Sequence, residues 1–78
     1  MNKFLEYISY NEEFGFEYNG VKYEVVSEFG RSIYKVEGNI LIQSFKNNKE
    51  LLEKATIEGL KLTSILDEII VDWYICVD

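Results

Sequence analysis

The sequence predicts a small α+β domain with a short N-terminal helix, an antiparallel β-meander of three or four strands, two short helices and a C-terminal strand. Three observations predict this class. Asn19-Gly20, the pair most typical of a two-residue type I′ turn, separates two runs of alternating apolar residues. Asn47 and Glu50 have the spacing of a helix capping box. Residues 69–77 are rich in the β-branched and aromatic side chains that strands favour.

The composition indicates one globular unit. The chain has 78 residues, and we expect residues 1–78 to form a single domain. Its 47% hydrophobic and 15% aromatic residues are typical of a folded chain. Cys76 is the one cysteine, so no intramolecular disulfide supports the core. Lys3 and Glu6 argue against a signal peptide, and no apolar run reaches the ~20 residues of a membrane span, so we expect a cytoplasmic location.

The first elements are a helix and a hairpin. We expect a short helix at residues 2–10 with Asn2 as its N-cap, because Phe4, Leu5 and Ile8 have the spacing of one apolar helix face. Strands at 13–18 and 21–27 follow, joined by the Asn19-Gly20 turn. The turn sets the cross-strand pairs as Tyr18 with Val21, Glu17 with Lys22, Phe16 with Tyr23, and Phe14 with Val25.

A third strand at 31–37 is expected from charge complementarity. Pairing Glu28 with Arg31 across Phe29-Gly30 places Glu24 opposite Lys35 and Lys22 opposite Glu37. The same register sets Val25 against Tyr34 and Tyr23 against Val36, so that Phe14, Phe16, Tyr18, Tyr23 and Tyr34 share one apolar face. Phe29 is a poor first residue for a type I′ turn, however. A type I turn with Gly30 in a G1 bulge is the alternative, and it shifts this pairing.

The second half of the chain contains the remaining strands and helices. Gly38-Asn39 is a turn before a fourth strand at 40–45, and the capping box opens a helix at 48–55. After a break at 57–59, the spacing of Leu62, Ile65, Leu66 and Ile69 predicts a second short helix. In the terminal strand, alternation places Val71, Trp73, Ile75 and Val77 on one face and Asp72, Tyr74 and Cys76 on the other.

Three segments in this order resemble a group of small, acidic, uncharacterised proteins of Gram-positive bacteria and their phages or mobile elements. The segments are Phe-x-Tyr-Asn-Gly-x-x-Tyr, Asn-Lys-Glu-Leu-Leu-Glu-Lys-Ala-x-Ile-x-Gly and Leu-x-x-Ile-Leu-Asp-Glu-Ile. The resemblance covers roughly residues 3–70, and its motifs are structural. It implies an accessory or phage-borne interaction protein, and it provides no enzymatic activity that could be assigned to this chain.

The residue content argues against catalysis, metal binding and direct nucleic-acid binding. The chain has no histidine, so neither a Ser-His nor a Cys-His nucleophile is possible. Asp67 and Glu68 are adjacent on a helix and point in different directions, which makes a poor acid–base pair. Cys76 alone forms no zinc site, and we expect no metal and no cofactor. The formal net charge of −6 repels phosphate backbones.

The excess negative charge lies at the two ends of the chain. Lys3 stands against three acids in residues 1–13, whereas residues 67–78 hold four acids and no base. Tyrosine and tryptophan are common at binding hot spots, so exposed tyrosines beside these acids suit a protein interface. The expected partner-binding residues are Glu12, Glu13, Tyr18, Asp67, Glu68, Asp72, Tyr74 and Asp78.

Two functions follow as expectations. The first is a non-enzymatic protein-binding module, in particular a phage or mobile-element inhibitor of the anti-CRISPR or anti-defence type. It would block a basic nucleic-acid-binding enzyme through an acidic, aromatic surface. The second is a self-associating host accessory or structural protein, a homodimer through its C-terminal strand. Such an apolar strand must either be buried in its own sheet or pair with another chain, and the sequence leaves both open.

Overall fold

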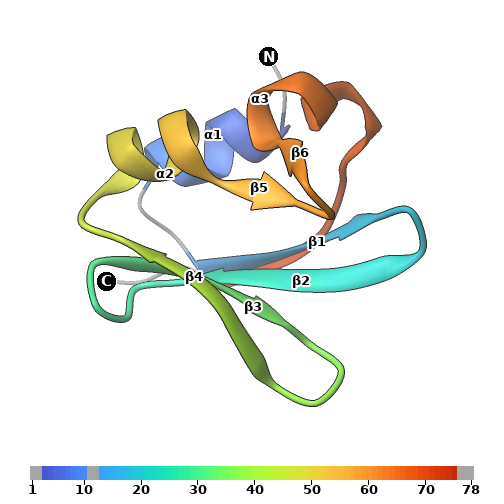
Figure 1. Cartoon of the computed structure of the whole chain (residues 1–78), viewed down its shortest axis with the longest axis horizontal. Coiled ribbons are helices and arrows are strands. Elements are labelled where there is room, and N and C mark those ends of the chain that lie inside the picture. The colour runs from blue at the N-terminus through green and yellow to red at the C-terminus, as the bar shows by residue number, and fades with distance from the viewer. Residues whose placement is uncertain (1–2, 11–12, 76–78) are drawn as a thin grey trace.

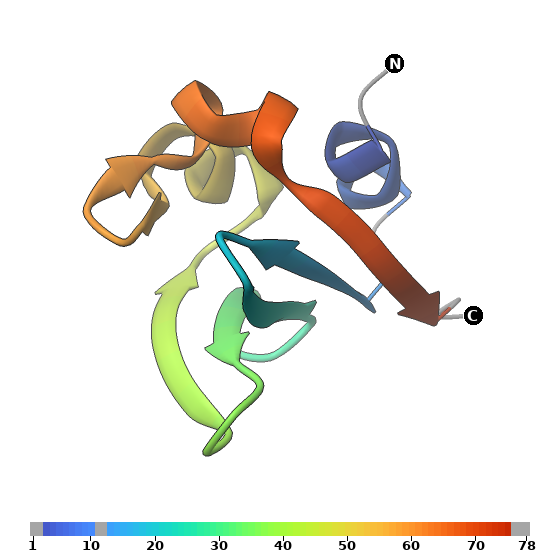
Figure 2. The same cartoon turned by 90° about the vertical axis from the view of Figure 1, so that its right-hand side faces the viewer.

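The helices of this α+β protein lie together on one face of an antiparallel sheet (Figures 1 and 2). The structure is a computed structural model, described here for residues 3–10 and 13–75. The elements are α1 (Lys3–Ser9), β1 (Glu13–Tyr18), β2 (Val21–Val26), β3 (Arg31–Lys35), β4 (Ile40–Phe45), α2 (Asn48–Lys54), β5 (Thr56–Ile57), β6 (Leu60–Lys61), α3 (Leu62–Ile65), the 3₁₀ helix η1 (Leu66–Glu68) and β7 (Ile70–Ile75). The main sheet has the strand order β4-β3-β2-β1-β7, so β4 and β7 are its edges.

The β1–β2 hairpin has the predicted register. Phe14 pairs with Val25, Phe16 with Tyr23, and Tyr18 with Val21. Asn19 and Gly20 have φ values of 53° and 80°, as a type I′ turn requires of both central residues. The apolar side chains of this hairpin therefore face the helices together.

The predicted pairing of β2 with β3 is wrong by one residue. Val25 is paired with Ile33 rather than Tyr34, and Glu24 is paired with Tyr34 rather than Lys35. The slip removes Tyr34 from the apolar face and buries Ile33 completely. Burying an isoleucine contributes about 1.5–3 kcal/mol, whereas each cross-strand charge pair contributes about 0.2–1 kcal/mol. The observed register therefore keeps Ile33 in the core and gives up three predicted charge pairs, which together contribute about 0.6–3 kcal/mol.

The core lies between the sheet and the helices. Phe4 of α1 packs edge-on against Phe14 and Phe16, with ring centroids 5.1 Å and 5.3 Å apart. Aromatic rings favour this edge-to-face geometry because a positive ring edge meets a negative ring face. The buried apolar residues are Phe4, Ile8, Phe14, Phe16, Tyr23, Val25, Ile33, Phe45, Leu51, Ala55, Ile57, Leu62 and Ile65.

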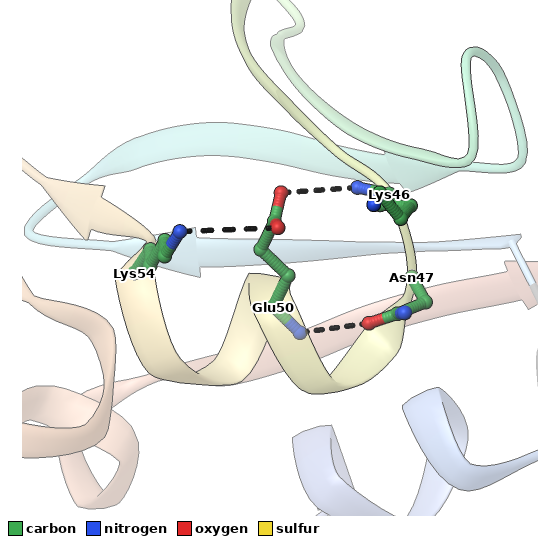
Figure 3. A network of polar contacts seen from close by, with 4 residues as sticks. All are labelled: Lys46, Asn47, Glu50 and Lys54. Atoms are coloured by element: carbon green, nitrogen blue, oxygen red, sulfur yellow. Dashed lines mark hydrogen bonds and ion pairs between the residues drawn. The ribbon is translucent and has the colours of Figure 1, made fainter.

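Asn47 caps α2 as predicted, but the Glu50 side chain reaches back to the residue before the cap rather than to the cap itself (Figure 3). The Asn47 side chain accepts a hydrogen bond from the Glu50 backbone N–H at 2.9 Å. The Glu50 carboxylate in turn accepts from the Lys46 backbone N–H at 3.2 Å and lies 3.9 Å from the Lys54 ammonium. The Asn47 contact satisfies one of the backbone donors that a helix start leaves without an intrahelical partner, and the Glu50 contact holds the residue that precedes the cap.

The break predicted at 57–59 is itself a small hairpin. β5 and β6 pair through Ile57 and Leu60, and the turn residues Glu58 and Gly59 have φ values of 54° and 79°. The predicted second helix then appears as two short pieces, α3 and η1. Leu62 and Ile65 are buried as the helical spacing indicates.

The C-terminal strand pairs with β1 within its own sheet. Phe16 is paired with Val71 and Gly15 with Trp73, so Asp72 is an extra residue at a β-bulge. Beyond the bulge Tyr74 is opposite Phe14, which breaks the predicted alternation of Val71 with Trp73 and Ile75. Cys76 and Val77 lie outside the described residues.

Candidate protein-binding surfaces

Two of the predicted site residues meet at one end of the molecule, which we call the acidic end and define as Tyr18, Glu58 and Glu68. Tyr18 closes β1, Glu58 is in the β5–β6 turn and Glu68 is in η1. The Asn19 side-chain amide donates to the Glu58 carboxylate at 3.4 Å, which ties the β1–β2 turn to the β5–β6 turn. Partial burial raises the pKa of Tyr18, and the negative charges of Glu68 and Glu58 raise it further. The acidic end therefore presents a neutral phenol beside two carboxylates.

The remaining predicted acids are placed differently. Asp67 is exposed in η1, next to Glu68. Asp72 lies on β7, where its carboxylate is 3.9 Å from the Lys22 ammonium, so its charge is partly balanced. Tyr74 is in β7 with its backbone opposite Phe14. Two further predicted residues, Glu12 and Asp78, lie outside the described residues.

Glu13 belongs to a different part of the molecule. Its carboxylate accepts a hydrogen bond from the Ser27 backbone N–H at 3.0 Å. The buried Arg31 donates to the Ser27 hydroxyl at 2.8 Å. Burial lowers the pKa of Arg31, and the nearby Glu13 charge opposes that shift. Glu13 thus holds the β2–β3 loop and is separate from the acidic end.

Sequence reasoning missed Phe29, which is 73% exposed at the tip of the β2–β3 loop. Its φ of 54° is uncommon for a bulky side chain. The loop around it is braced, because Glu28 accepts hydrogen bonds from the Ser32 hydroxyl at its carbonyl and from the Tyr34 hydroxyl at its carboxylate. A rigidly presented aromatic side chain is suited to a partner's pocket. The signal in the sequence was a phenylalanine in a turn position that requires positive φ.

Sequence reasoning also missed an apolar patch on the β3–β4 hairpin, which we call the β3–β4 patch. Its members are aliphatic and between 39% and 52% exposed: Val36, Ile40, Leu41 and Ile42. The signal in the sequence was the run Ile40-Leu41-Ile42, because no charged residue separates it from Lys46. Such a run in an edge strand is unusual, because edge strands are commonly protected by charges.

The tyrosine environments predict a loss of stability at alkaline pH. A hydrogen bond to Glu28 raises the pKa of Tyr34, and burial raises the pKa of Tyr23 and of Tyr18. Above the ordinary value of 10.0 the unfolded chain loses these protons first, so deprotonation favours unfolding. The contribution of these tyrosines to the free energy of unfolding is therefore fully present below pH 10, and it is lost as pH rises through their folded-state pKa values.

This prediction is checked by titrating tyrosinate absorbance and circular dichroism together. We expect Tyr34→Phe to remove one of the late-titrating groups and to reduce the pH dependence of unfolding. Tyrosines that all titrate at their ordinary pKa while the circular dichroism stays native would contradict the prediction.

No helix among the residues 3–10 and 13–75 has the length and apolar character needed to cross a membrane. Compared with family models, curated proteins and solved structures, the chain shows no significant match to any of them.

Proposed function

We propose that the chain is a non-enzymatic protein-binding module that occupies a basic surface of a larger protein. The observation that carries this proposal is the acidic end, where segments far apart in the sequence bring Glu58 and Glu68 beside Tyr18. Carboxylates accept hydrogen bonds from arginine and lysine, and the ring supplies apolar contact area. The basic partner we propose is a nucleic-acid-binding enzyme, inhibited in the manner of an anti-CRISPR or anti-defence protein.

Electrostatic attraction alone is too weak to supply the affinity of such an inhibitor. A net charge of −6 attracts a basic groove and speeds association, but exposed ion pairs contribute only about 0.2–1 kcal/mol each. Shape-specific contacts must therefore supply most of the affinity. Within the acidic end the half-buried Tyr18 ring offers such a contact, because an aromatic side chain presents a large apolar area with few rotatable bonds.

Self-association is the second candidate function, and Ile70 is the observation that favours it. β7 uses one edge to pair with β1 and is the last strand of the sheet on that side. Ile70 is 61% exposed at its start. A second copy pairing along this edge would cover that side chain.

The proposal predicts salt-sensitive capture of a nucleic-acid enzyme by the tagged chain from a Gram-positive bacterial lysate. Neutralising the acidic end with Glu58→Gln and Glu68→Gln should weaken binding to the purified enzyme by about 2–30-fold, the sum of two exposed charge pairs. Glu37→Gln with Glu53→Gln is the matched control, because both residues are exposed and the net charge changes equally. Calorimetry at low and high salt measures all three proteins.

The control pair should bind like the unmodified chain. Equal weakening by both pairs would show that overall charge, and not the acidic end, attracts the enzyme. Salt-insensitive binding would exclude the electrostatic version, and recovery of the tagged chain alone would contradict the inhibitor function.

A further inference from the structure

The two edges of the sheet differ in charge. β4 has the sequence Ile-Leu-Ile-Gln-Ser-Phe, without a charged residue. β7 carries Asp72, and Asp67 and Glu68 precede it in η1. Edge strands present unpaired backbone groups that another strand can join, and charges are a common protection against this. Of the two edges, β4 is the one without that protection.

The exposed part of β4 extends away from the helical layer (Figure 1). At the other half of the strand the Gln43 side chain donates to the Thr56 hydroxyl at 2.9 Å and accepts from the Thr56 backbone N–H at 3.1 Å, which fastens β4 to β5. Ile40, Leu41 and Ile42 lie beyond this contact and are 52%, 44% and 39% exposed. Ile40 is opposite Lys35 and Leu41 is opposite Tyr34, so the apolar side chains flank this edge of the sheet on both of its faces.

A second copy of the same chain is the occupant that the charges favour. In a two-fold contact the same surface meets itself, so a charged edge repels its copy and a neutral edge does not. Contact through β7 would bring the acids of η1 and β7 toward their equivalents. Contact through β4 brings aliphatic side chains together, and Lys35 and Glu37 on the same hairpin are of opposite sign. A strongly basic partner finds no acidic cluster in this hairpin.

We propose that two copies of this chain associate about a two-fold axis through the β3–β4 patch, with their β4 strands adjacent. The pairing of β3 with β4 shifts between Ile33 and Tyr34, which leaves Ile42 as the extra residue of a bulge. Bulges weaken regular strand pairing at an edge. The aliphatic side chains, rather than a long backbone ladder, therefore supply most of the attraction. Association is independent of the acidic end, whose residues come from β1, η1 and the β5–β6 turn.

Analytical ultracentrifugation of the full chain tests this proposal. At high micromolar concentration we expect a species of twice the 9.2 kDa chain mass. Leu41→Lys should raise the dimer dissociation constant by about tenfold or more, because the two-fold axis places the new charge twice in an apolar contact. The matched control is Leu60→Lys, which makes the same change at an exposed leucine of β6, outside both edges of the main sheet, and should leave the constant unchanged. Added salt should leave the dimer intact.

Two further measurements separate association from folding. Leu41→Asn introduces no charge and should also weaken the dimer, and circular dichroism should show both Leu41 variants folded. Amide hydrogen exchange of residues 40–42 in the unmodified chain should slow as its concentration rises. A monomer at high micromolar concentration overturns the proposal, and so does a dimer that Ile70→Lys breaks and Leu41→Lys does not. Neither result bears on enzyme binding by the acidic end.

Discussion

Phe4→Ala is expected to destabilise the protein by about 3–5 kcal/mol, the usual cost of deleting a buried phenylalanine. Phe4 is fully buried, and its ring contacts Phe14 and Phe16 edge-on. It is also one of two buried residues in α1, a helix of seven residues. So short a helix is not stable without tertiary packing. The loss compares with a total stability of roughly 4–12 kcal/mol for a chain of this length, so the variant should lose a large fraction of its free energy of unfolding.

Urea denaturation followed by circular dichroism measures this effect. Phe29→Ala is the matched control, because the same atoms are deleted from a ring that is 73% exposed. We expect it to change stability by no more than about 0.5 kcal/mol. If the two variants had equal midpoints, the docking of α1 through Phe4 would be refuted.

Gly30→Ala is expected to destabilise by about 2–5 kcal/mol, through two separate terms. Gly30 has φ of 96°, and left-handed backbone costs an alanine about 1–2 kcal/mol. A Cβ there would also overlap the Phe45 carbonyl oxygen and would lie 2.7 Å from the Lys46 carbonyl oxygen. Overpacking of this kind costs about 1–3 kcal/mol more, since both neighbours are backbone atoms that cannot rotate away.

Gly20→Ala measures the cost of left-handed backbone without the steric overlap. Gly20 has φ of 80°, but a Cβ at this position would meet nothing within 4 Å. It should therefore cost only about 1–2 kcal/mol. The same denaturation experiment measures the difference between the two variants, which reports the close approach of the β2–β3 loop to the end of β4. Equal losses would contradict that approach.

Local patterns predicted most of the elements, and long-range packing decided what they missed. Asn19-Gly20 and the Asn47–Glu50 box act within a few residues, so their outcomes follow from the sequence. The β2–β3 register does not, because it depends on whether Ile33 or Tyr34 enters the core. That choice is made by residues on other elements. The poor fit of Phe29 to its turn was a correct warning of this slip.

The candidate surfaces show the same division. Tyr18 and Glu68 were expected as parts of an interface, but Glu58 joins them only because the β5–β6 turn folds back to the β1–β2 turn. Glu13 was expected there too, and the fold instead places it against the β2–β3 loop. Proximity in sequence does not predict these neighbours, because strand crossing and helix docking bring distant segments together.

Local sequence patterns are enough to predict the α+β class, the first hairpin with its register, the cap of α2 and the uneven distribution of charge. These properties depend on backbone preferences and side-chain periodicity, which act over a few residues. The strand order β4-β3-β2-β1-β7 and the burial of Ile33 depend instead on how distant segments pack together. The same packing decides which apolar residues stay exposed on β4. These properties depend on the total apolar area removed from water, and that area is a property of the whole chain.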